Sequence, residues 1–309
     1  MAGVEIIKIA PEDDGIRLNR WFLREYPSLS LSRLQKLLRT KQIKVDGKRA
    51  ETATRLIAGQ ELRIPPLDNE KVKKDNKDLN QKDIEYINSL VIFKDEKIIV
   101  LNKPSGLAVQ GGTNTKKHID GMLEALKYES IEKPKLVHRI DKDTSGILVL
   151  ARNRKYAEIL TKAFREHNII KTYLALVRGC PEKLSGIIDF PLEKIGEKME
   201  ISESGQKALT DFKVLDKTGK KYALIEAKPL TGRKHQIRAH LEAIGTPILG
   251  DNKYFGNERK HLNEFANKLF LHAYKIDLSE IYGKKMQITA KIPQYFKEAC
   301  DFLGLEEIK

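Results

Sequence analysis

Several features that mark common protein classes are scarce in this sequence of 309 residues. It has only two cysteines, Cys180 and Cys300, which lie far apart and form no CxxC pair. This pattern suits a reducing compartment, in which both thiols are buried or incidental to function. No apolar run approaches the ~20 residues that span a bilayer. The N-terminus carries acids early and lacks a basic stretch followed by an apolar one, so we expect no secretory signal, no membrane association and a cytoplasmic protein.

Cofactor and metal motifs are also missing. The sequence contains neither GxGxxG nor GxxxxGKS/T, so the motifs that usually indicate a dinucleotide-binding or a P-loop nucleotide-binding enzyme are missing. Its seven histidines form no HExxH pair, and His235 and His240 are five residues apart, a spacing that places them poorly for one helix face. We therefore expect no cofactor and no metal ion.

What the sequence does have is an excess of positive charge. It contains 57 lysines and arginines against 43 acidic residues, a net charge of +14. Such an excess favours a polyanionic partner, because each cation that meets a phosphate releases condensed counterions. A generally lysine-rich composition is the alternative, and composition alone does not decide between the two.

Residues 14–67 are predicted to form a small domain of two helices followed by a small sheet. Apolar residues at helical spacing predict a helix at 18–25 that Pro27 ends, and Ser30 or Ser32 can cap a second helix at 31–39. Polar and apolar residues then alternate around Asp46-Gly47, which is a strong hairpin signal, and a strand at 61–65 closes the unit.

Between residues 31 and 49 this small domain carries seven basic residues and one acid. A solvated helix face is the plain explanation, but so one-sided a charge favours a surface for nucleic acid. The residues expected to bind RNA there are Arg33, Lys36, Arg39, Lys41 and Lys44. The pattern of two short helices, hairpin and basic face resembles the S4 RNA-binding domain over residues 14–66.

Residues 68–83 are almost entirely charged or polar and are predicted to form a flexible linker. The remainder, 84–309, reads as one α+β domain. Strands are expected at 91–103, 135–140, 146–152, 172–179, 210–217, 222–230 and 285–292. Helices are expected at 119–130, 154–167, 234–244 and 293–304. Because loops rather than regular crossover helices join many of the strands, we expect a mixed or largely antiparallel sheet.

Two polar segments of this domain are candidates for chemistry. The first is HRIDKDTSG, residues 138–146, a highly charged loop between two apolar runs. The second is TGRKHQIRAH, residues 231–240, which opens a helix whose apolar face borders Arg238 and which Gly245 would cap. A buried arginine needs a carboxylate partner, and Asp141 or Asp143 can supply it.

These two segments resemble motifs of the RluA family of RNA pseudouridine synthases, HRLDxxTSG and GRTHQIRxH. LNKPSG from Leu101, KTYLALVRG from Lys171 and LHA from Leu271 are similar to further family segments, in the family's order. The run VLNKPSGLAVQGG followed by LVHRIDKDTSGILVLAR resembles the C-type members, which act on large-subunit rRNA. The chain departs from the family at Ile140 and Lys234, and Gln110 stands where C-type members carry histidine.

The resemblance implies roles for particular residues. Asp141 matches the nucleophilic aspartate, Arg238 the arginine that ion-pairs with it, and Tyr173 the tyrosine that stacks under the target base. Arg139, Arg233 and His235, in the same two motifs, are expected to bind RNA.

The reaction moves the glycosidic bond of uridine from N1 to C5, without redox change or energy input. The carboxylate can attack C1′, add at C6 or help to expel uracil, and the sequence leaves these routes open. It also leaves open a synthase for tRNA or small-subunit rRNA, or a non-catalytic RNA-binding protein of ribosome assembly. We expect a monomer with RNA as its partner.

Overall fold

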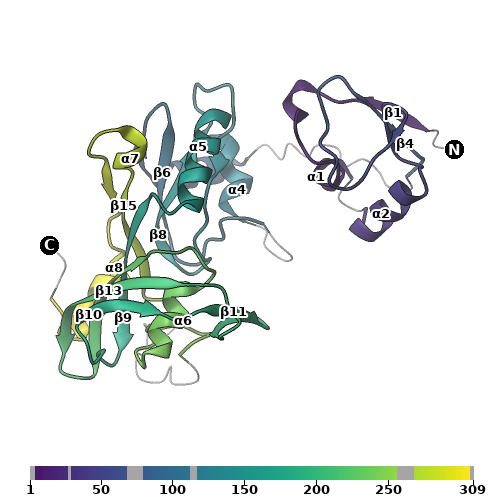
Figure 1. Cartoon of the computed structure of the whole chain (residues 1–309). Coiled ribbons are helices and arrows are strands. Elements are labelled where there is room, and N and C mark those ends of the chain that lie inside the picture. Colours follow the sequence, from purple (N-terminus) through teal and green to yellow (C-terminus); the bar gives the residue numbers. More distant parts are fainter. Residues whose placement is uncertain (1–3, 27–28, 68–78, 112–116, 256–267, 307–309) are drawn as a thin grey trace. The chain divides into compact units, whose positions relative to one another are not determined.

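The computed structural model describes residues 4–26, 29–67, 79–111, 117–255 and 268–306. The chain divides into two compact units, Met1–Asp78 and Leu79–Lys309, and each has its own hydrophobic core (Figure 1). We describe each unit by itself.

The smaller unit packs two helices against a four-stranded antiparallel sheet of order β1-β4-β2-β3. Its elements are β1 (Glu5–Lys8), the 3₁₀ turn η1 (Pro11–Asp13), α1 (Leu18–Glu25), α2 (Leu31–Arg39), β2 (Lys44–Val45), β3 (Lys48–Arg49) and β4 (Glu61–Ile64). Of the two predicted caps it is Ser30 that begins α2, because its side chain accepts a hydrogen bond from the backbone N–H of Arg33. Asp46 and Gly47 both have positive φ, as a two-residue hairpin turn requires.

The core of this unit includes residues that the helical pattern of the sequence predicts to be buried. Leu18, Trp21 and Phe22 of α1 pack against Leu34 and Leu38 of α2 and against the sheet. A buried carboxylate completes the packing, since Asp13 pairs with Arg24 and accepts a hydrogen bond from Trp21 Nε1 at 3.1 Å. This burial fixes α1 on the loop that precedes it.

The boundaries of the small domain differ from the predicted 14–67. The unit begins earlier, because β1 pairs along its whole length with β4, and residues 5–13 are therefore part of the fold. At the other end, the predicted linker 68–83 is too long, since Asn80 caps a helix that starts at Gln81. Residues 68–78 of that linker, and Pro27, lie outside the described residues.

The larger unit is built on a ten-stranded mixed sheet. Its main path runs β10 (Ser185–Asp189), β13 (Leu209–Thr218), β14 (Tyr222–Pro229), β9 (Ile170–Arg178), β15 (Leu271–Asp277), β8 (Ser145–Ala151), β6 (Ile98–Lys103) and β5 (Val91–Lys94), with β16 (Gln287–Thr289) beside β15 and β7 (Lys135–Leu136) beside β8. β15 and β8 are parallel, and the other described pairs are antiparallel. The prediction of a mixed, largely antiparallel sheet in an α+β fold is confirmed.

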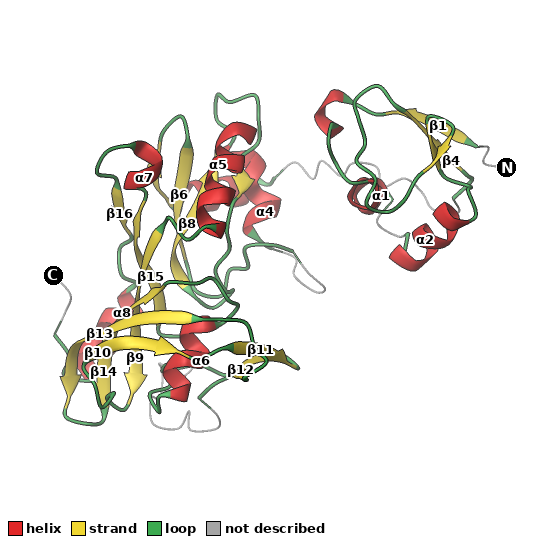
Figure 2. Ribbon diagram, viewed as in Figure 1, coloured by secondary structure: helices red, strands yellow, loops and turns green. Residues whose placement is uncertain are grey.

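Helices cover both faces of the β6–β8 half of this sheet (Figure 2). Alternate residues of β8 point to the two sides, so that Val149 packs with α5 and Leu150 with the helices on the opposite face. Burial on both faces explains why β6 and β8 read as continuous apolar runs. The helices of the unit are α3 (Gln81–Ser89), α4 (Ile119–Met122), the 3₁₀ segment η2 (Leu123–Leu126), α5 (Arg154–Arg165), α6 (Gln236–Ala243), α7 (Ser279–Tyr282) and α8 (Gln294–Phe302).

Three details of the predicted elements are corrected by the structure. The predicted strand 135–140 is only two residues long, because the chain turns into the 138–144 loop ahead of β8. The strand 91–103 is a hairpin of β5 and β6, joined at Asp95, whose side chain accepts from the N–H groups of Lys97 and Ile98. The two-stranded hairpin of β11 (Leu192–Ile195) and β12 (Lys198–Ile201), like β10 and β15, is absent from the predicted set.

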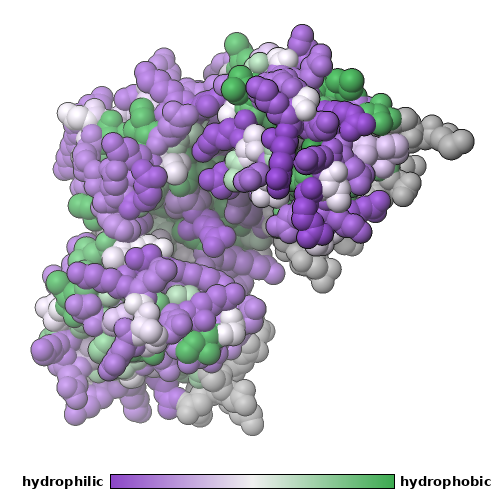
Figure 3. All heavy atoms as spheres, turned by 45° about the vertical axis from the view of Figure 1, so that its right-hand side comes forward, coloured by the Kyte–Doolittle hydropathy of each residue, from purple (hydrophilic) through white to green (hydrophobic). Residues whose placement is uncertain are grey.

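The surface shown in Figure 3 is mainly hydrophilic, with apolar side chains in scattered spots rather than in one continuous patch. In the described part of the chain, no helix is long and apolar enough to cross a membrane.

Candidate active site

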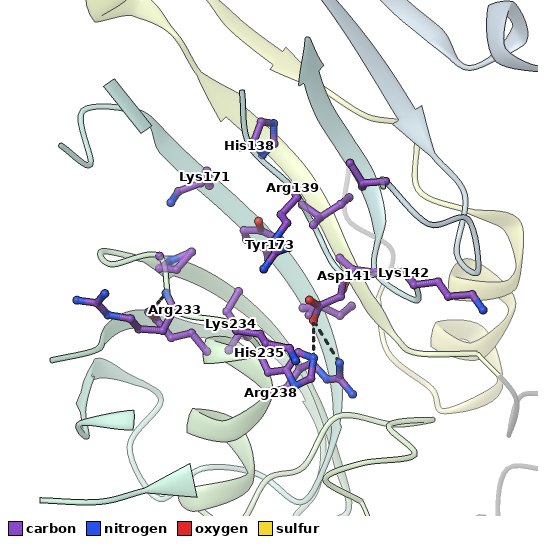
Figure 4. Close-up of a pocket in the computed structure, with 18 of the residues that line it drawn as sticks. His138, Arg139, Asp141, Lys142, Lys171, Tyr173, Arg233, Lys234, His235 and Arg238 are labelled. Carbon is purple, nitrogen blue, oxygen red and sulfur yellow. Dashed lines mark hydrogen bonds and ion pairs between the residues drawn. The ribbon is translucent and has the colours of Figure 1, made fainter. Parts of the chain in front are cut away.

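A pocket of about 900 Å³ lies where three segments of the larger unit meet. These are the loop 138–144 ahead of β8, the strand β9, and the segment 231–238 that leads into α6 (Figure 4). Positive charge dominates the lining, with Arg139, Lys142, Arg165, Lys171, Arg233, Lys234, Arg238 and Lys253 against only Asp141 and Asp143. The pocket therefore suits a polyanionic ligand.

The first wall is held in place by hydrogen bonds to its backbone. Buried Lys103 donates from Nζ to the carbonyl oxygens of Pro104, Leu107 and Lys142, at 2.8–2.9 Å. The hydroxyl of Ser105 donates to the carbonyl of Asp143 at 2.7 Å. The two residues that follow Asp141 in the loop are thus tied to the end of β6 and the segment after it, which restricts the position of the aspartate.

His138 has a structural part in this wall. Its Nε2 accepts the backbone N–H of Val149 at 2.8 Å, and its ring stacks on Phe164 of α5 with centroids 4.2 Å apart. Burial lowers the pKa of His138 to about 3, so the ring is neutral and serves as an acceptor. Of the titratable residues in the HRID run, His138 therefore anchors the loop, whereas Arg139 and Asp141 reach into the pocket (Figure 4).

The second wall is the start of α6. Gln236 accepts from the hydroxyl of Thr231 at 2.6 Å and from the N–H of Arg233 at 3.1 Å, and its amide donates to the carbonyl of Leu209 at 2.8 Å. This buried glutamine closes the 231–236 segment into a turn. At its end His235 adopts the left-handed conformation, with φ 50°, and Gly245 ends the helix as predicted, with φ 75°.

Across the pocket, Arg238 joins two carboxylates. Its Nη1 lies 3.2 Å from Oδ2 of Asp141. Its Nε and Nη2 form a two-pronged pair with Asp251, at 2.6 and 2.7 Å. Both Arg238 and Asp251 are buried, so the pair with Asp251 fixes the guanidinium while the third nitrogen reaches the half-buried Asp141.

Tyr173 projects from β9 on the wall between these two segments, close to Arg139 and Asp141 (Figure 4). Burial, with a smaller contribution from Asp141, raises the pKa of Tyr173 well above its usual value. Its hydroxyl is therefore protonated at neutral pH. Lys171, two residues earlier on the same strand, also lines the pocket, and burial lowers the pKa of its amine.

The structure brings six of the predicted site residues together around one pocket: Asp141, Tyr173, Arg238, Arg139, Arg233 and His235. Of the two aspartates proposed as partners of Arg238, it is Asp141 that makes the contact. The other five, Arg33, Lys36, Arg39, Lys41 and Lys44, belong to the smaller unit, where four are exposed and Lys44 is half-buried. Their RNA contacts stay a prediction.

Three residues of the site were missed by sequence reasoning. Lys103 carried no pattern, although it lies inside the LNKPSG segment, and neither did Tyr254, whose ring centroid lies 5.1 Å from the guanidinium carbon of Arg238. For Asp251 there was an indirect signal. A buried Arg238 that reaches Asp141 with one nitrogen has further N–H donors, which need a second acceptor such as another carboxylate. Among the described residues, no group of three His, Cys, Asp or Glu side chains is placed to hold a metal ion.

Comparisons with known proteins all match the chain to one family of enzymes. Residues 97–243 match the family model described as RNA pseudouridylate synthase. The chain is 40% identical over 291 residues to the ribosomal large subunit pseudouridine synthase C of Rickettsia conorii, covering 91% of this chain and 95% of that protein. It is 32% identical over 313 residues to the protein of that name from Escherichia coli, covering 97% of each.

Among solved structures, the chain is similar to human RNA pseudouridylate synthase domain containing 4, with a TM-score of 0.63 and 28% identity. That similarity covers 73% of this chain and 97% of the human one.

Proposed function

The chain belongs to the RluA family of RNA pseudouridine synthases, and from that premise we propose that it converts uridine to pseudouridine in large-subunit rRNA with Asp141 as the catalytic carboxylate. The observation that carries the assignment of Asp141 is its contact with Arg238, 3.2 Å away, on the floor of a basic pocket that Tyr173 also lines.

The electrostatics of this contact suit a carboxylate that must be ionised and aimed. Arg238 is held by Asp251 and cannot follow Asp141 if the loop moves, so it acts as a fixed positive charge at one side of the carboxylate. The charge-assisted contact with this fixed guanidinium orients the carboxylate. Attack on C1′, addition at C6 and assistance to the departure of uracil all require an ionised carboxylate at the sugar side of the base.

Tyr173 is suited to stacking under a uridine that has been flipped out of the RNA. Flipping costs a few kcal/mol, and stacking on an aromatic ring returns about 1–3 kcal/mol. Because its hydroxyl is protonated at neutral pH, Tyr173 can take part in removing the C5 proton only as a relay that accepts one proton while it donates another.

The choice of large-subunit rRNA rests on two observations. The relatives at 32–40% identity carry that substrate in their names. The smaller unit presents exposed Arg33, Lys36, Arg39 and Lys41 on α2 and the turn after it, which suits phosphate contacts on a structured RNA. We propose that this unit is an S4-like RNA-binding domain. We also propose that the enzyme works as a monomer in the cytoplasm, where ribosomes are assembled.

The experiment that tests this function maps pseudouridines in total RNA from cells with and without the protein. We expect discrete pseudouridines in large-subunit rRNA to disappear with the protein and to return when it is supplied again, but not when Asp141→Ala is supplied. Loss of pseudouridine from tRNA alone would move the substrate to tRNA. An unchanged map of all RNAs would leave the non-catalytic assembly role.

A further inference from the structure

His235 stands beside the proposed catalytic aspartate and is held by a second residue. Its Nε2 lies 3.7 Å from Oδ2 of Asp141, and its Nδ1 lies 3.1 Å from the hydroxyl of Tyr254. The two rings meet edge to face, with centroids 5.8 Å apart and planes at 90°. The side chain of His235 is only 6% exposed, so water competes little for either nitrogen.

The hydrogen bonds of Tyr254 determine which nitrogen of His235 carries the proton. The backbone N–H of Met199, in β12, donates to the Tyr254 hydroxyl at 2.8 Å, so this oxygen is already an acceptor. Its single proton needs an acceptor of its own, and Nδ1 of His235 is the one in reach among the described residues. Nδ1 therefore accepts, and the proton of the neutral imidazole lies on Nε2, which faces Asp141.

The charges around His235 keep it in this neutral form. Arg238 on α6, Lys234 directly before His235 in the chain and Lys253 in the pocket lining all oppose protonation, and Asp141 alone favours it. Burial is the largest influence, and together these lower the pKa of His235 to about 4. The amine of Lys198 lies 5.9 Å from the centroid of the Tyr254 ring and adds positive charge.

Arg238 and His235 approach the same oxygen of Asp141. Both contacts are to Oδ2, at 3.2 Å from Arg238 and 3.7 Å from His235, and no described residue donates a hydrogen bond to Oδ1 (Figure 4). The distance from His235 exceeds a hydrogen bond, but such contacts in the absence of substrate commonly tighten when the substrate binds.

We propose that His235 is a positioning residue, fixed by Tyr254 as the neutral Nε2–H tautomer, and that its N–H and Arg238 together hold Oδ2 of Asp141 so that Oδ1 is the oxygen presented to the nucleotide. This rests on the proposed function, and it replaces the expectation that His235 contacts RNA. Two donors on one oxygen restrict rotation of the carboxylate and leave the other oxygen free.

The tautomer can be measured without any assay of activity. In the full-length protein labelled with ¹⁵N-histidine, the resonance of His235 is assigned by its loss in His235→Gln. We expect a protonated, pyrrole-type Nε2 and an unprotonated Nδ1 at neutral pH. In Tyr254→Phe, which keeps the ring over Arg238 but removes the hydroxyl, the Nδ1 signal should shift. A proton on Nδ1, or an imidazolium at neutral pH, would overturn the proposal.

The kinetic test separates positioning from RNA binding. His235→Ala and Tyr254→Phe should each lower the single-turnover rate at saturating RNA about five- to tenfold, as loss of one neutral hydrogen bond implies, with RNA affinity unchanged. His235→Gln puts a non-glycine residue at the same left-handed position as His235→Ala does, but its side-chain amide is a neutral hydrogen-bond donor. It should therefore recover part of the rate that His235→Ala loses. Tyr282→Phe, which removes a half-buried hydroxyl that donates to Asp95 at 2.6 Å outside the pocket, is the control.

The outcomes are distinct. Weaker RNA binding by His235→Ala with an unchanged rate at saturation would make His235 an RNA contact and overturn the proposal. Absence of pseudouridine formation by the unaltered protein would overturn the proposed function instead, and the nitrogen spectra would still report the tautomer.

Discussion

At the scale of single residues, Lys103 is a buried cation that holds the loop of the proposed nucleophile. Its side chain is fully buried, yet its ammonium satisfies three backbone carbonyls, one of which belongs to Lys142 next to the proposed nucleophile. Burial lowers the pKa of Lys103 to about 7, against the favourable charges of Asp143 and Asp141. The loop that carries Asp141 is thus held by a group whose charge is costly to bury.

This burial predicts a pH dependence of stability. The unfolded chain keeps the proton of Lys103 up to about pH 10.5, whereas the folded protein releases it from about pH 7. Since the unfolded state binds more protons in that window, Lys103 destabilises the fold most below pH 7, and this cost is relieved as the pH rises. The free energy of unfolding of the unaltered protein should therefore rise, relative to that of Lys103→Met, between pH 7 and 10.

Chemical denaturation of the two proteins across this range measures the effect. Methionine has a similar length to lysine and no charge. Other titrating groups, Lys171 among them, are common to both proteins, so their contributions cancel in the difference between the two free energies of unfolding. Lys103→Met should also lower the single-turnover rate, because three carbonyls near the loop lose their donor. A constant difference in stability between the two proteins would show that Lys103 does not titrate on folding.

The sequence was informative about residues whose chemistry is concentrated in short segments. Asp141, Arg238 and Tyr173 come from three such segments, and they line one pocket. Asp251 and Tyr254 do not lie in such a segment, and the one signal for Asp251 was indirect, namely the further donors that a buried Arg238 must satisfy. Their roles arise only from contacts, with Arg238 for Asp251 and with His235 for Tyr254.

At the level of elements, the parallel contact of β8 with β15 joins the two halves of the large sheet. His272 and Ala273 of β15 lie opposite Ser145 and Gly146, directly after the loop of Asp141. Gly146 has φ 105°, and a Cβ placed on it would lie within 2.2 Å of the carbonyl oxygen of Ala273. Only glycine permits the strands to approach this closely.

We therefore predict that Gly146→Ala lowers the free energy of unfolding by more than about 3 kcal/mol, through overpacking against a backbone atom that cannot move aside. The matched control is Gly219→Ala, which also has a positive φ, of 59°, but meets open space. It should cost only about 1–2 kcal/mol, the strain of a left-handed residue. Equal losses for the two variants in urea denaturation would contradict the steric explanation.

Elements with a strong pattern were predicted well and short ones were not. The run that became β8 is apolar because both of its faces are buried, and α5 and α8 follow regular helical spacing. The predicted strand at 135–140 failed because His138 bonds the backbone of Val149 with its ring, so that the chain leaves the sheet after β7. β10 went unrecognised because Ile187 is exposed and the alternation is weak.

For the whole molecule, the separate cores of Met1–Asp78 and Leu79–Lys309 predict a division of labour. A fragment of residues 79–309 should fold and retain the pocket, since all the described residues that line it come from that unit. It should bind structured rRNA more weakly than the full chain and with less dependence on salt. If about three or four phosphate contacts are lost, the log–log slope should fall by about three.

Binding measured across a salt series for both proteins tests this prediction. The full chain with Arg33, Lys36 and Lys41 changed to glutamine is the matched comparison, because it keeps the small unit but removes exposed charge. An unchanged slope in both variants would make these residues an ordinary solvated surface. The sequence predicted a separate basic unit from its charge, but not the pairing of β1 with β4, because a four-residue strand at a terminus has little signal.

The central claim is that Asp141 is the catalytic carboxylate of a pseudouridine synthase, and single-turnover formation of pseudouridine in a large-subunit rRNA substrate tests it most directly. Asp141→Ala and Asp141→Asn should each lower the rate more than about 10³-fold, as loss of a nucleophile does. Both should remain folded and bind RNA, because the side chain is 28% exposed and Arg238 keeps its pair with Asp251. Asp143→Asn, in the same loop, should reduce the rate far less. Substantial turnover by Asp141→Ala would contradict the account.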